Sequence, residues 1–360
     1  MEGARLRALL RLAYLELPPR RLRLLLEHYH EPEAIFSASR QELLRLEGMT
    51  EAVAARILNA PELTPKQWQR WQQAEARLLT WRDDGYPPPL REIEDFPPLL
   101  FVRGSLQERD RFAIAIVGTR RPTPYGRSIA ERLARELSRY GLTVVSGGAR
   151  GIDTAAHTGA LRAGGRTLAV LGCGIDVAYP ADSAALFQRI STQGAVLSEY
   201  PPGITPDAWR FPARNRLVSA LALGVLVVEA PNDSGALITA THALEQGKPV
   251  FAVPGNIDTG HSAGCHQLIK DGATLVDSVE DVVCGLGIAP EPPPERTAPV
   301  PSLTPMQQQL LQSLSLTPKH VDTLADELGM PVAQLNAELL LLEMHNLVRR
   351  QPGNTYVRVL

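Results

Sequence analysis

Apolar and polar residues alternate in blocks through the middle of the chain. An apolar run at 112–117 stops at Gly118, and a helical pattern with apolar residues on one face fills 125–140. A second apolar run at 142–146 ends at Gly147. Strand, glycine turn, helix and strand in this order are typical of a βαβ unit, whose parallel strands are buried on both faces. The pattern therefore predicts parallel strands with turns at their carboxyl ends.

The same alternation continues to residue 287 and predicts the fold class. Further strands are expected at 167–171, 195–199, 224–229, 249–253 and 273–276, and further helices at 153–163, 183–192, 214–222, 236–246, 263–270 and 279–286. Strands that alternate with helices of this length indicate an α/β fold with a doubly wound parallel sheet of the extended Rossmann-like kind.

The segment before the sheet has a different pattern. Residues 1–80 show amphipathic helical stripes, and the stretch 43–57 resembles a helix-hairpin-helix in which Thr50 replaces the usual second glycine. DNA binding and a small SAM-like helical bundle for protein contacts both remain open for this region. A proline-rich connector, 81–104, ends in a strand-like run that we expect at a sheet edge.

The segment after the sheet is divided by prolines. Seven of the 16 residues at 290–305 are proline, which indicates a linker at 288–304. Three helical patterns and a terminal hairpin then predict a winged-helix-like unit at 305–360. Its candidate recognition helix, 334–343, has two acidic residues and no basic one, which favours protein docking over duplex reading. The predicted units are 1–80, 81–287, 288–304 and 305–360.

Composition excludes several classes of protein. No apolar run reaches membrane-spanning length and no secretory signal is recognisable, so no membrane partner is expected. Three widely spaced cysteines form no disulfide framework, and we expect a cytoplasmic protein. The net charge is −2, but 33 of the 37 basic residues are arginine, the side chain suited to forked contacts with phosphate. Where the arginines lie therefore matters more than their total.

Several arginines fall where the predicted strands end. Because carboxyl ends of parallel strands meet at one edge, the turns that follow them are expected to converge on one cleft. Backbone amides at such turns also favour anions. Phe211 and Trp209 lie among these arginines and could stack on bases, although core packing is an equal interpretation for Phe211. The arginines at or near the proposed cleft are Arg120, Arg121, Arg150, Arg210, Arg214 and Arg216.

Enzymatic chemistry finds little support in the same turns. The chain has no GxGxxG turn for a dinucleotide, no ATP-binding P-loop and no GxSxG nucleophile elbow. Asp153 and His157 are spaced four apart, but the position of Asp153 favours a helix cap. His261, Cys265 and His266 lack a matching fourth ligand for a metal. We therefore predict a binding protein without catalytic residues, metal or cofactor.

At these turns the sequence closely resembles the DNA-processing protein A (DprA/Smf) family. The resemblance covers roughly 81–287, and the flanking units resemble those often attached to the family. The matching stretches are Ile116–Arg120, Tyr125-Gly126, Ser146–Asp153, Ala156-His157, Asp176 with Tyr179-Pro180, Ser198–Pro201, Phe211–Arg216, Glu229-Ala230, Ser234–Thr239, Val253–Gly255 and Gly264–Ile269.

The resemblance implies a single-stranded DNA-binding protein of natural transformation that protects incoming strands and helps to load the RecA recombinase. It also implies a homodimer formed through the sheet domain, and single-strand-binding protein is a further candidate partner. The phosphate-binding residues expected from the turns and the resemblance together are Gly118, Thr119, Arg120, Arg121, Ser146, Gly147, Gly148, Arg150, Phe211, Arg214, Asn215, Arg216, Ser234, Gly235 and Thr239.

The sequence departs from the family pattern at a few positions. Gly148 stands where the family has a leucine or another residue, and Arg150 stands where it often has a lysine. His266 replaces an asparagine that is common in the family. The main alternative is a nucleotide phosphoribohydrolase of the related lysine-decarboxylase-like (LOG) family. That family carries a catalytic glutamate in a PGGxGTxxE turn, whereas the corresponding stretch 231–239 lacks it.

Overall fold

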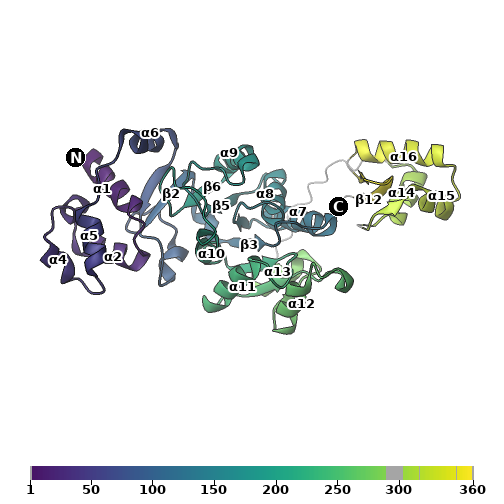
Figure 1. Cartoon of the computed structure of the whole chain (residues 1–360). Coiled ribbons are helices and arrows are strands. Elements are labelled where there is room, and N and C mark those ends of the chain that lie inside the picture. Colours follow the sequence, from purple (N-terminus) through teal and green to yellow (C-terminus); the bar gives the residue numbers. More distant parts are fainter. Residues whose placement is uncertain (1, 289–302, 316, 346, 359–360) are drawn as a thin grey trace.

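The computed structural model describes residues 2–288, 303–315, 317–345 and 347–358. Figure 1 shows a helical region near the N-terminus, a central sheet covered by helices, and a smaller lobe near the C-terminus. Among the described residues, no helix combines the length and the apolar character needed to span a bilayer.

The centre of the molecule is a nine-stranded sheet in the order β1-β2-β6-β5-β4-β3-β7-β8-β9. All neighbouring pairs from β6 to β9 are parallel, whereas β2 pairs antiparallel with both β1 and β6. This arrangement confirms the predicted α/β fold. The strands are β1 (Arg77–Thr80), β2 (Leu99–Gly104), β3 (Ala113–Val117), β4 (Thr143–Ser146), β5 (Thr167–Leu171), β6 (Ala195–Ser198), β7 (Gly224–Val227), β8 (Val250–Ala252) and β9 (Thr274–Leu275).

Helices cover both faces of the sheet because the central strands are apolar on both sides. One apolar core joins β3, β4, β7 and β8 to α7, α8 and α13, and a second joins the opposite face to α10 and α11. The helices after β1 are α7 (Pro124–Arg139), α8 (Ile152–Arg162), α9 (Ala184–Gln193), α10 (Arg210–Ala220), α11 (Ala236–Glu245), α12 (Ala263–Lys270) and α13 (Val279–Gly285), with short 3₁₀ turns at Pro88–Glu92, Glu108–Arg111, Ala181–Ser183 and Ile257–Thr259.

The N-terminal helices pack on the sheet rather than standing apart. Their apolar residues join Phe101 of β2 and Leu171 of β5 in one buried cluster. Gly48 has a φ of +71°, and the Thr50 side chain caps α5 by accepting the Val53 N–H, so Thr50 has a structural role in this turn. These helices are α1 (Glu2–Tyr14), α2 (Pro19–His28), α3 (Pro32–Ile35), α4 (Arg40–Leu44), α5 (Glu51–Leu58) and α6 (Pro65–Gln73).

Three details of the predicted secondary structure are wrong. Strand β1 lies at 77–80, inside the range expected to be helical. Strand β2 is not at the edge, because β1 pairs with it on the outer side. Helix α10 begins at Arg210 instead of residue 214. Pro212 lies in the first turn of this helix, where its missing N–H has no intrahelical partner to lose.

The C-terminal lobe has an apolar core of its own, which includes Leu310, Leu324 and Leu339. Its three-stranded sheet has the order β10-β12-β11. Helices and hairpin follow the predicted winged-helix plan, with one short strand added. Most of the predicted linker, residues 289–302, lies outside the described residues. The elements are α14 (Pro305–Ser313), β10 (Lys319–His320), α15 (Val321–Leu328), α16 (Val332–Met344), β11 (Val348–Gln351) and β12 (Thr355–Arg358).

Candidate nucleic-acid interface

The connections of the sheet change direction at β3. From this strand the chain adds β4, β5 and β6 on one side, and later β7, β8 and β9 on the other. The turn after β3 and the turn after β7 therefore lead away from each other at the carboxyl edge of the sheet. Open α/β sheets place their ligands at such a point.

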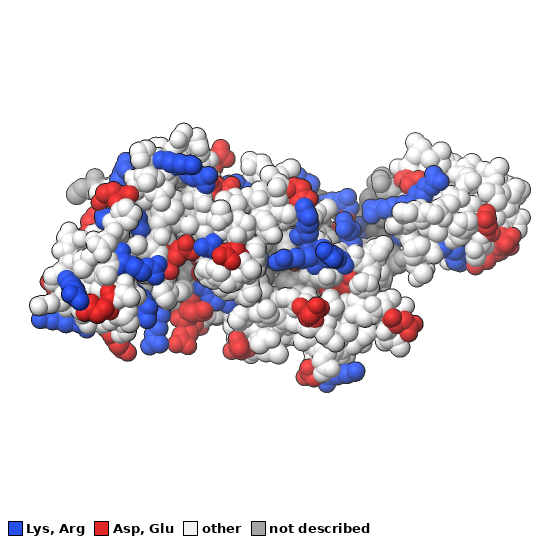
Figure 2. Space-filling model, viewed as in Figure 1, with Lys and Arg blue, Asp and Glu red and all other residues white. Residues whose placement is uncertain are grey.

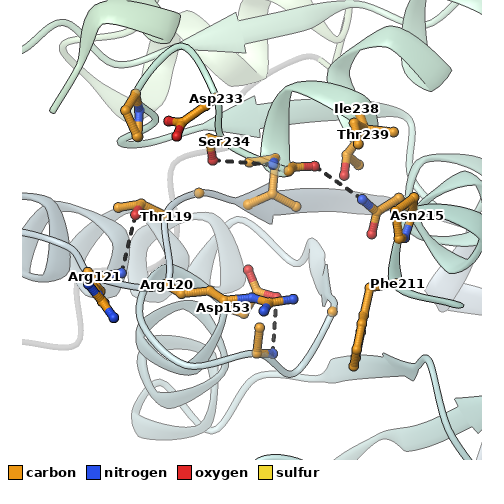
Figure 3. A pocket seen from close by; sticks show the side chains of 18 of the residues that line it. Thr119, Arg120, Arg121, Asp153, Phe211, Asn215, Asp233, Ser234, Ile238 and Thr239 are labelled. Carbon is orange, nitrogen blue, oxygen red and sulfur yellow. Dashed lines mark hydrogen bonds between the residues drawn. The ribbon is translucent and has the colours of Figure 1, made fainter. Parts of the chain in front are cut away.

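A cleft of about 840 Å³ lies at this point of the sheet (Figure 3). Its walls come from the turns after β3, β4 and β7, from the start of α10, and from the loop before α12. Eleven of the fifteen residues predicted from the sequence line it: Gly118, Thr119, Arg120, Arg121, Gly147, Phe211, Arg214, Asn215, Ser234, Gly235 and Thr239.

The turn after β3 presents two arginines while its backbone is fixed from behind. The Thr119 N–H donates to the Glu229 carbonyl over 2.7 Å, and the Arg121 N–H donates to the Thr119 hydroxyl over 3.2 Å. A Cβ on Gly118 would stand 2.5 Å from Ile152, so this position requires glycine. Arg120 and Arg121 are both exposed, and no ion pair within the described ranges engages either. Their guanidinium groups are therefore available to an anion.

Buried Glu229 holds the loop between β3 and α7. Its carboxylate accepts the backbone N–H and the hydroxyl of Thr123, which is the N-cap of α7. A Cβ on Gly126 would approach this carboxylate to 2.3 Å, which explains the glycine of the Tyr125-Gly126 motif. Glu229 is thus a positioning residue for the loop that carries the two arginines.

The turn after β4 is fixed by the residues beneath it. Ser146 is fully buried, and its hydroxyl donates to the Ile116 carbonyl over 2.7 Å, so it cannot reach a ligand in the cleft. Gly148 has a φ of +70° and backs onto Phe187. Asp153 accepts the Ala149 N–H over 3.2 Å and so fixes this turn. The expected helix cap is wrong, because the N-cap of α8 is Gly151 and no side chain caps it.

Arg214 lines the cleft, but its guanidinium group is hydrogen-bonded to other groups of the chain. Its buried guanidinium donates to the carbonyls of Gly147 and Val170. Burial lowers the pKa of Arg214, and the Asp153 charge opposes that change. Burial likewise raises the pKa of Asp153, against the attraction of Arg214. The two groups form a buried charged support beneath the glycine turn.

The placement expected for Arg216 is wrong. Its side chain is buried on another side of α10, in ion pairs with Asp95 at 2.6 Å and Glu199 at 2.8 Å. Burial lowers the pKa of Arg216, but the Glu199 and Asp95 carboxylates outweigh that effect and raise it. Residues two apart on a helix point about 200° away from each other, so Arg214 and Arg216 cannot both face the cleft.

Arg210 and Trp209 also lie away from the cleft. Arg210 is buried and forms an ion pair with Glu16 of the N-terminal region at 2.7 Å. Trp209 is 56% exposed and lines a different hollow, formed with residues of the N-terminal segment. Both residues belong to the contact between α10 and the N-terminal region.

Phe211 faces the guanidinium of Arg120 across the cleft (Figure 3). The Arg120 Cζ lies 5.2 Å from the centre of the Phe211 ring. Tyr179, 43% exposed, has its ring 5.4 Å from that of Phe211. The sequence argument did not assign Tyr179 to the site, although its place just beyond the glycine turn after β5 was a usable signal.

Arg150 stands at a second hollow of about 510 Å³ that joins the cleft. Arg120, Arg150, Tyr179, Phe211 and Arg214 all line it, so the three arginines lie on one side of the molecule, as the sequence argument requires. Arg150 is exposed and forms an ion pair with Asp182 at 3.3 Å. Because both partners are largely exposed, this pair contributes little to stability and can open for a ligand.

The remaining wall of the cleft is the turn after β7. Ser234 and Gly235 precede α11, and Asn215 of α10 donates to the Gly235 carbonyl over 3.2 Å. The N-terminus of α11 therefore faces the cleft, where its partial positive charge favours an anion. Lining residues that were not predicted from the sequence include Asp233, Ile238 and His261.

The expected cradle of backbone amides is partly wrong. The N–H groups of Thr119, Ala149 and Ser234 already donate to Glu229, Asp153 and Pro231. These three amides are therefore not free for an anion, whereas the side chains of Arg120 and Arg121 are exposed. The turns position these side chains more than they bind anions themselves.

The residues considered for catalysis and metal binding have other contacts. His157 is fully buried, with Nδ1 2.7 Å from the Thr167 hydroxyl, and burial lowers its pKa to about 3. His266 contacts the Gly255 backbone, and the Cys265 thiol contacts the Val227 carbonyl. In the part of the chain that the structure describes, no group of three His, Cys, Asp or Glu side chains could hold a metal ion.

Known proteins resemble this chain over most of its length. A family model described as DNA recombination-mediator protein A matches residues 77–287, and a DprA winged helix domain model matches 292–354. Protein Smf of Synechocystis is 34% identical, and the match covers 94% of this chain and 94% of that protein. The DNA processing protein DprA of Streptococcus pneumoniae is 48% identical over 56% of this chain and 71% of its own length.

Solved structures agree with the sequence comparison. The X-ray structure of DNA processing protein A from Streptococcus pneumoniae is 38% identical with a TM-score of 0.67, covering 76% of this chain and 95% of that one. The Helicobacter pylori protein, from a structure described as giving insights into its single-stranded DNA binding mode, is 33% identical with a TM-score of 0.53. That match covers 59% of this chain and 97% of the other. The family-model match over residues 77–287 and the Smf relative matched over 94% of both chains show that this chain belongs to the DprA/Smf family.

Proposed function

We propose that the chain binds single-stranded DNA in the cleft at the carboxyl edge of the sheet. Arg120 and Arg121 contact phosphates, and Phe211 with Tyr179 offers rings on which bases stack. The observation that carries the proposal is the facing pair of Arg120 and Phe211, one cation and one aromatic ring at the same concave site. Basic grooves with aromatic platforms are the usual means of binding single strands.

The aromatic rings favour a single strand over a duplex. Bases of a duplex are stacked on each other, whereas a single strand can turn its bases toward Phe211 and Tyr179. Both rings are accessible enough for such contact, since Tyr179 is 43% exposed and Phe211 lines both hollows. Every base has a stacking face, so binding is expected to show little sequence preference.

The biological role that we propose is the one expected for a member of this family. A recombination mediator of natural transformation that binds incoming strands would protect them and pass them to a recombinase. We propose RecA as that recombinase and a homodimer through the sheet domain as the active form, with single-strand-binding protein as a further partner. The recombination-mediator family model and the likeness to the Helicobacter pylori single-stranded DNA-binding protein support this proposal.

Binding without turnover fits the chemistry of the cleft. Asp153 is occupied by Ala149 and the charge of Arg214, and the stretch 231–239 has no glutamate. Incubation with AMP should therefore release no free adenine. Sustained release would instead favour the phosphoribohydrolase alternative.

A competition assay tests the proposal. The full chain is bound to a labelled single-stranded oligonucleotide and challenged with unlabelled single-stranded or duplex DNA of the same sequence. Single strands should compete at much lower concentrations than duplex. Equal competition, or an unchanged affinity when Arg120 and Phe211 are both replaced by alanine, would contradict the proposed site.

A further inference from the structure

A second basic surface lies on α7, outside the cleft. Arg127, Arg132, Arg135 and Arg139 occur at spacings of three to five residues, which places them on one side of the helix. Its opposite side carries the buried residues Ile129, Leu133 and Leu137. The arginines are not needed for packing the helix against the sheet, because that contact is made by the apolar side.

Three of the α7 arginines, Arg127, Arg132 and Arg135, line a hollow of about 720 Å³. Helix α8 contributes to one wall, and the β11–β12 hairpin of the C-terminal lobe forms the other. Six arginines and two glutamates line the hollow. It therefore has a strong excess of positive charge, although the net charge of the chain is −2. The arginines are Arg127, Arg132, Arg135, Arg162, Arg349 and Arg358, and the glutamates are Glu131 and Glu343.

The two glutamates contact groups other than Arg127 and Arg132. Glu131 forms an ion pair with Arg162 of α8, and the Glu343 carboxylate accepts the Arg350 backbone N–H. Over the described residues, no ion pair engages Arg127, Arg132 or Arg139. Figure 2 shows Lys and Arg side chains gathered over this part of the molecule, toward the C-terminal lobe. Like charges held this close repel one another, and a polyanion removes that cost.

The basic hollow is a continuation of the cleft along the chain. Arg121 lines the cleft, and the next residues, Pro122 and Pro124, already line the hollow. A strand that leaves the cleft past Arg121 would therefore meet the arginines of α7 next. Helix α7 has 16 residues, so its surface extends the site by about 24 Å.

We propose that the α7 arginines form an extension of the binding site that takes the phosphates of the same single strand where it leaves the cleft. This inference rests on the proposed function, since the strand must first occupy the cleft. Among the described residues that line the hollow none is aromatic, so contact there is with the backbone of the strand. It adds affinity and salt dependence and no preference for any base.

Strand length provides the test. A chain of about six nucleotides fits one small binding site, whereas one of about twenty can also follow α7. We compare affinities for both lengths in the wild type and in the double variant Arg127→Gln with Arg132→Gln. A longer strand can also bind in more registers, which raises its apparent affinity. This factor is the same for every variant and cancels when the gains in affinity are compared.

The double variant should bind the short strand as the wild type does and lose about tenfold of the gain from length, which corresponds to about 1.4 kcal/mol. Its salt slope with the long strand should fall by about 1.4, or about 0.7 for each phosphate that is no longer neutralised. Replacement of the same two residues by lysine should keep most of the gain. As a matched control, Arg77→Gln with Arg189→Gln removes two exposed charges elsewhere and should change nothing.

The outcomes separate the two proposals. Should the wild type bind neither strand length, the proposed function fails and the extension fails with it. Should both lengths bind and the α7 variant keep the full gain from length, the cleft proposal survives and the extension is wrong. In that case the basic hollow serves another polyanion, such as an acidic protein surface.

Discussion

Two arginine-rich segments were predicted at the same cleft, and the structure uses them in opposite ways. Arg120 and Arg121 follow a strand and stand exposed in a loop that Glu229 fixes from behind. Arg214 and Arg216 lie inside a helix and are buried, each bound to groups of the protein itself. Position in an element and the partners already present, rather than residue type, decide which arginine is left for a ligand.

The buried member of this comparison should matter most for stability. Replacing Arg216 by methionine leaves the buried Glu199 carboxylate without its partner and should lower the free energy of unfolding by about 3–5 kcal/mol. The matched change Arg120→Met removes an exposed charge and should stay within about 0.5 kcal/mol. Urea denaturation of both variants checks this, and similar losses in the two would contradict the assignment of Arg216 as structural.

Acid should destabilise the fold through His157, which is buried in α8 against the start of β5. Burial lowers its pKa to about 3, with a smaller effect of the Arg214 charge, whereas an unfolded histidine titrates near 6.5. Between pH 6.5 and pH 3, His157 is therefore protonated in the unfolded state and neutral in the folded state. Stability from this group, fully present above pH 6.5, falls by up to about 1.4 kcal/mol per pH unit below it.

The variant His157→Gln isolates this effect. It lacks the titrating group, so its stability difference from the wild type should shrink between pH 7 and pH 5. Urea denaturation at both values measures the difference. A constant difference would mean that His157 is not held neutral by burial.

Removing the aromatic ring of Phe211 should affect the affinity for single-stranded DNA and not the free energy of unfolding. Phe211→Leu keeps an apolar side chain but removes the stacking face, and should weaken single-strand binding by about 1–3 kcal/mol. Trp209→Leu, two residues earlier, is the control, because Trp209 lines a different hollow and should leave the affinity unchanged. Fluorescence anisotropy with one mixed-sequence oligonucleotide measures both. A larger loss from Trp209 would reverse the assignment.

Periodicity was enough to predict the sheet. The strand at 167–171 and the helix at 263–270 begin and end where they were expected, and most other bounds in the sheet region differ by one or two residues. Continuous apolar runs between glycine turns are a strong signal because parallel strands are buried on both faces. Strand β1 was missed because it is only four residues long and follows a helical segment.

The site was harder to predict because it depends on helix phase. Placing the start of α10 at residue 214 instead of Arg210 put Arg214 and Arg216 together at the end of a helix, near the cleft. Residues two apart on a helix diverge around its axis, so only one of the two can face the cleft. The glycine turns were located correctly, but the sequence does not reveal that Glu229, Asp153 and Pro231 already occupy their amides.

The central claim is that Arg120 in the loop after β3 contributes a phosphate contact that is independent of base sequence. The direct measurement is a salt titration of single-strand affinity for the wild type and Arg120→Gln, with several unrelated sequences. The variant should lose about tenfold in affinity on every sequence, equivalent to about 1.4 kcal/mol, and its salt slope should fall by about 0.7. Unchanged affinity and slope, or a loss confined to one sequence, would contradict the account.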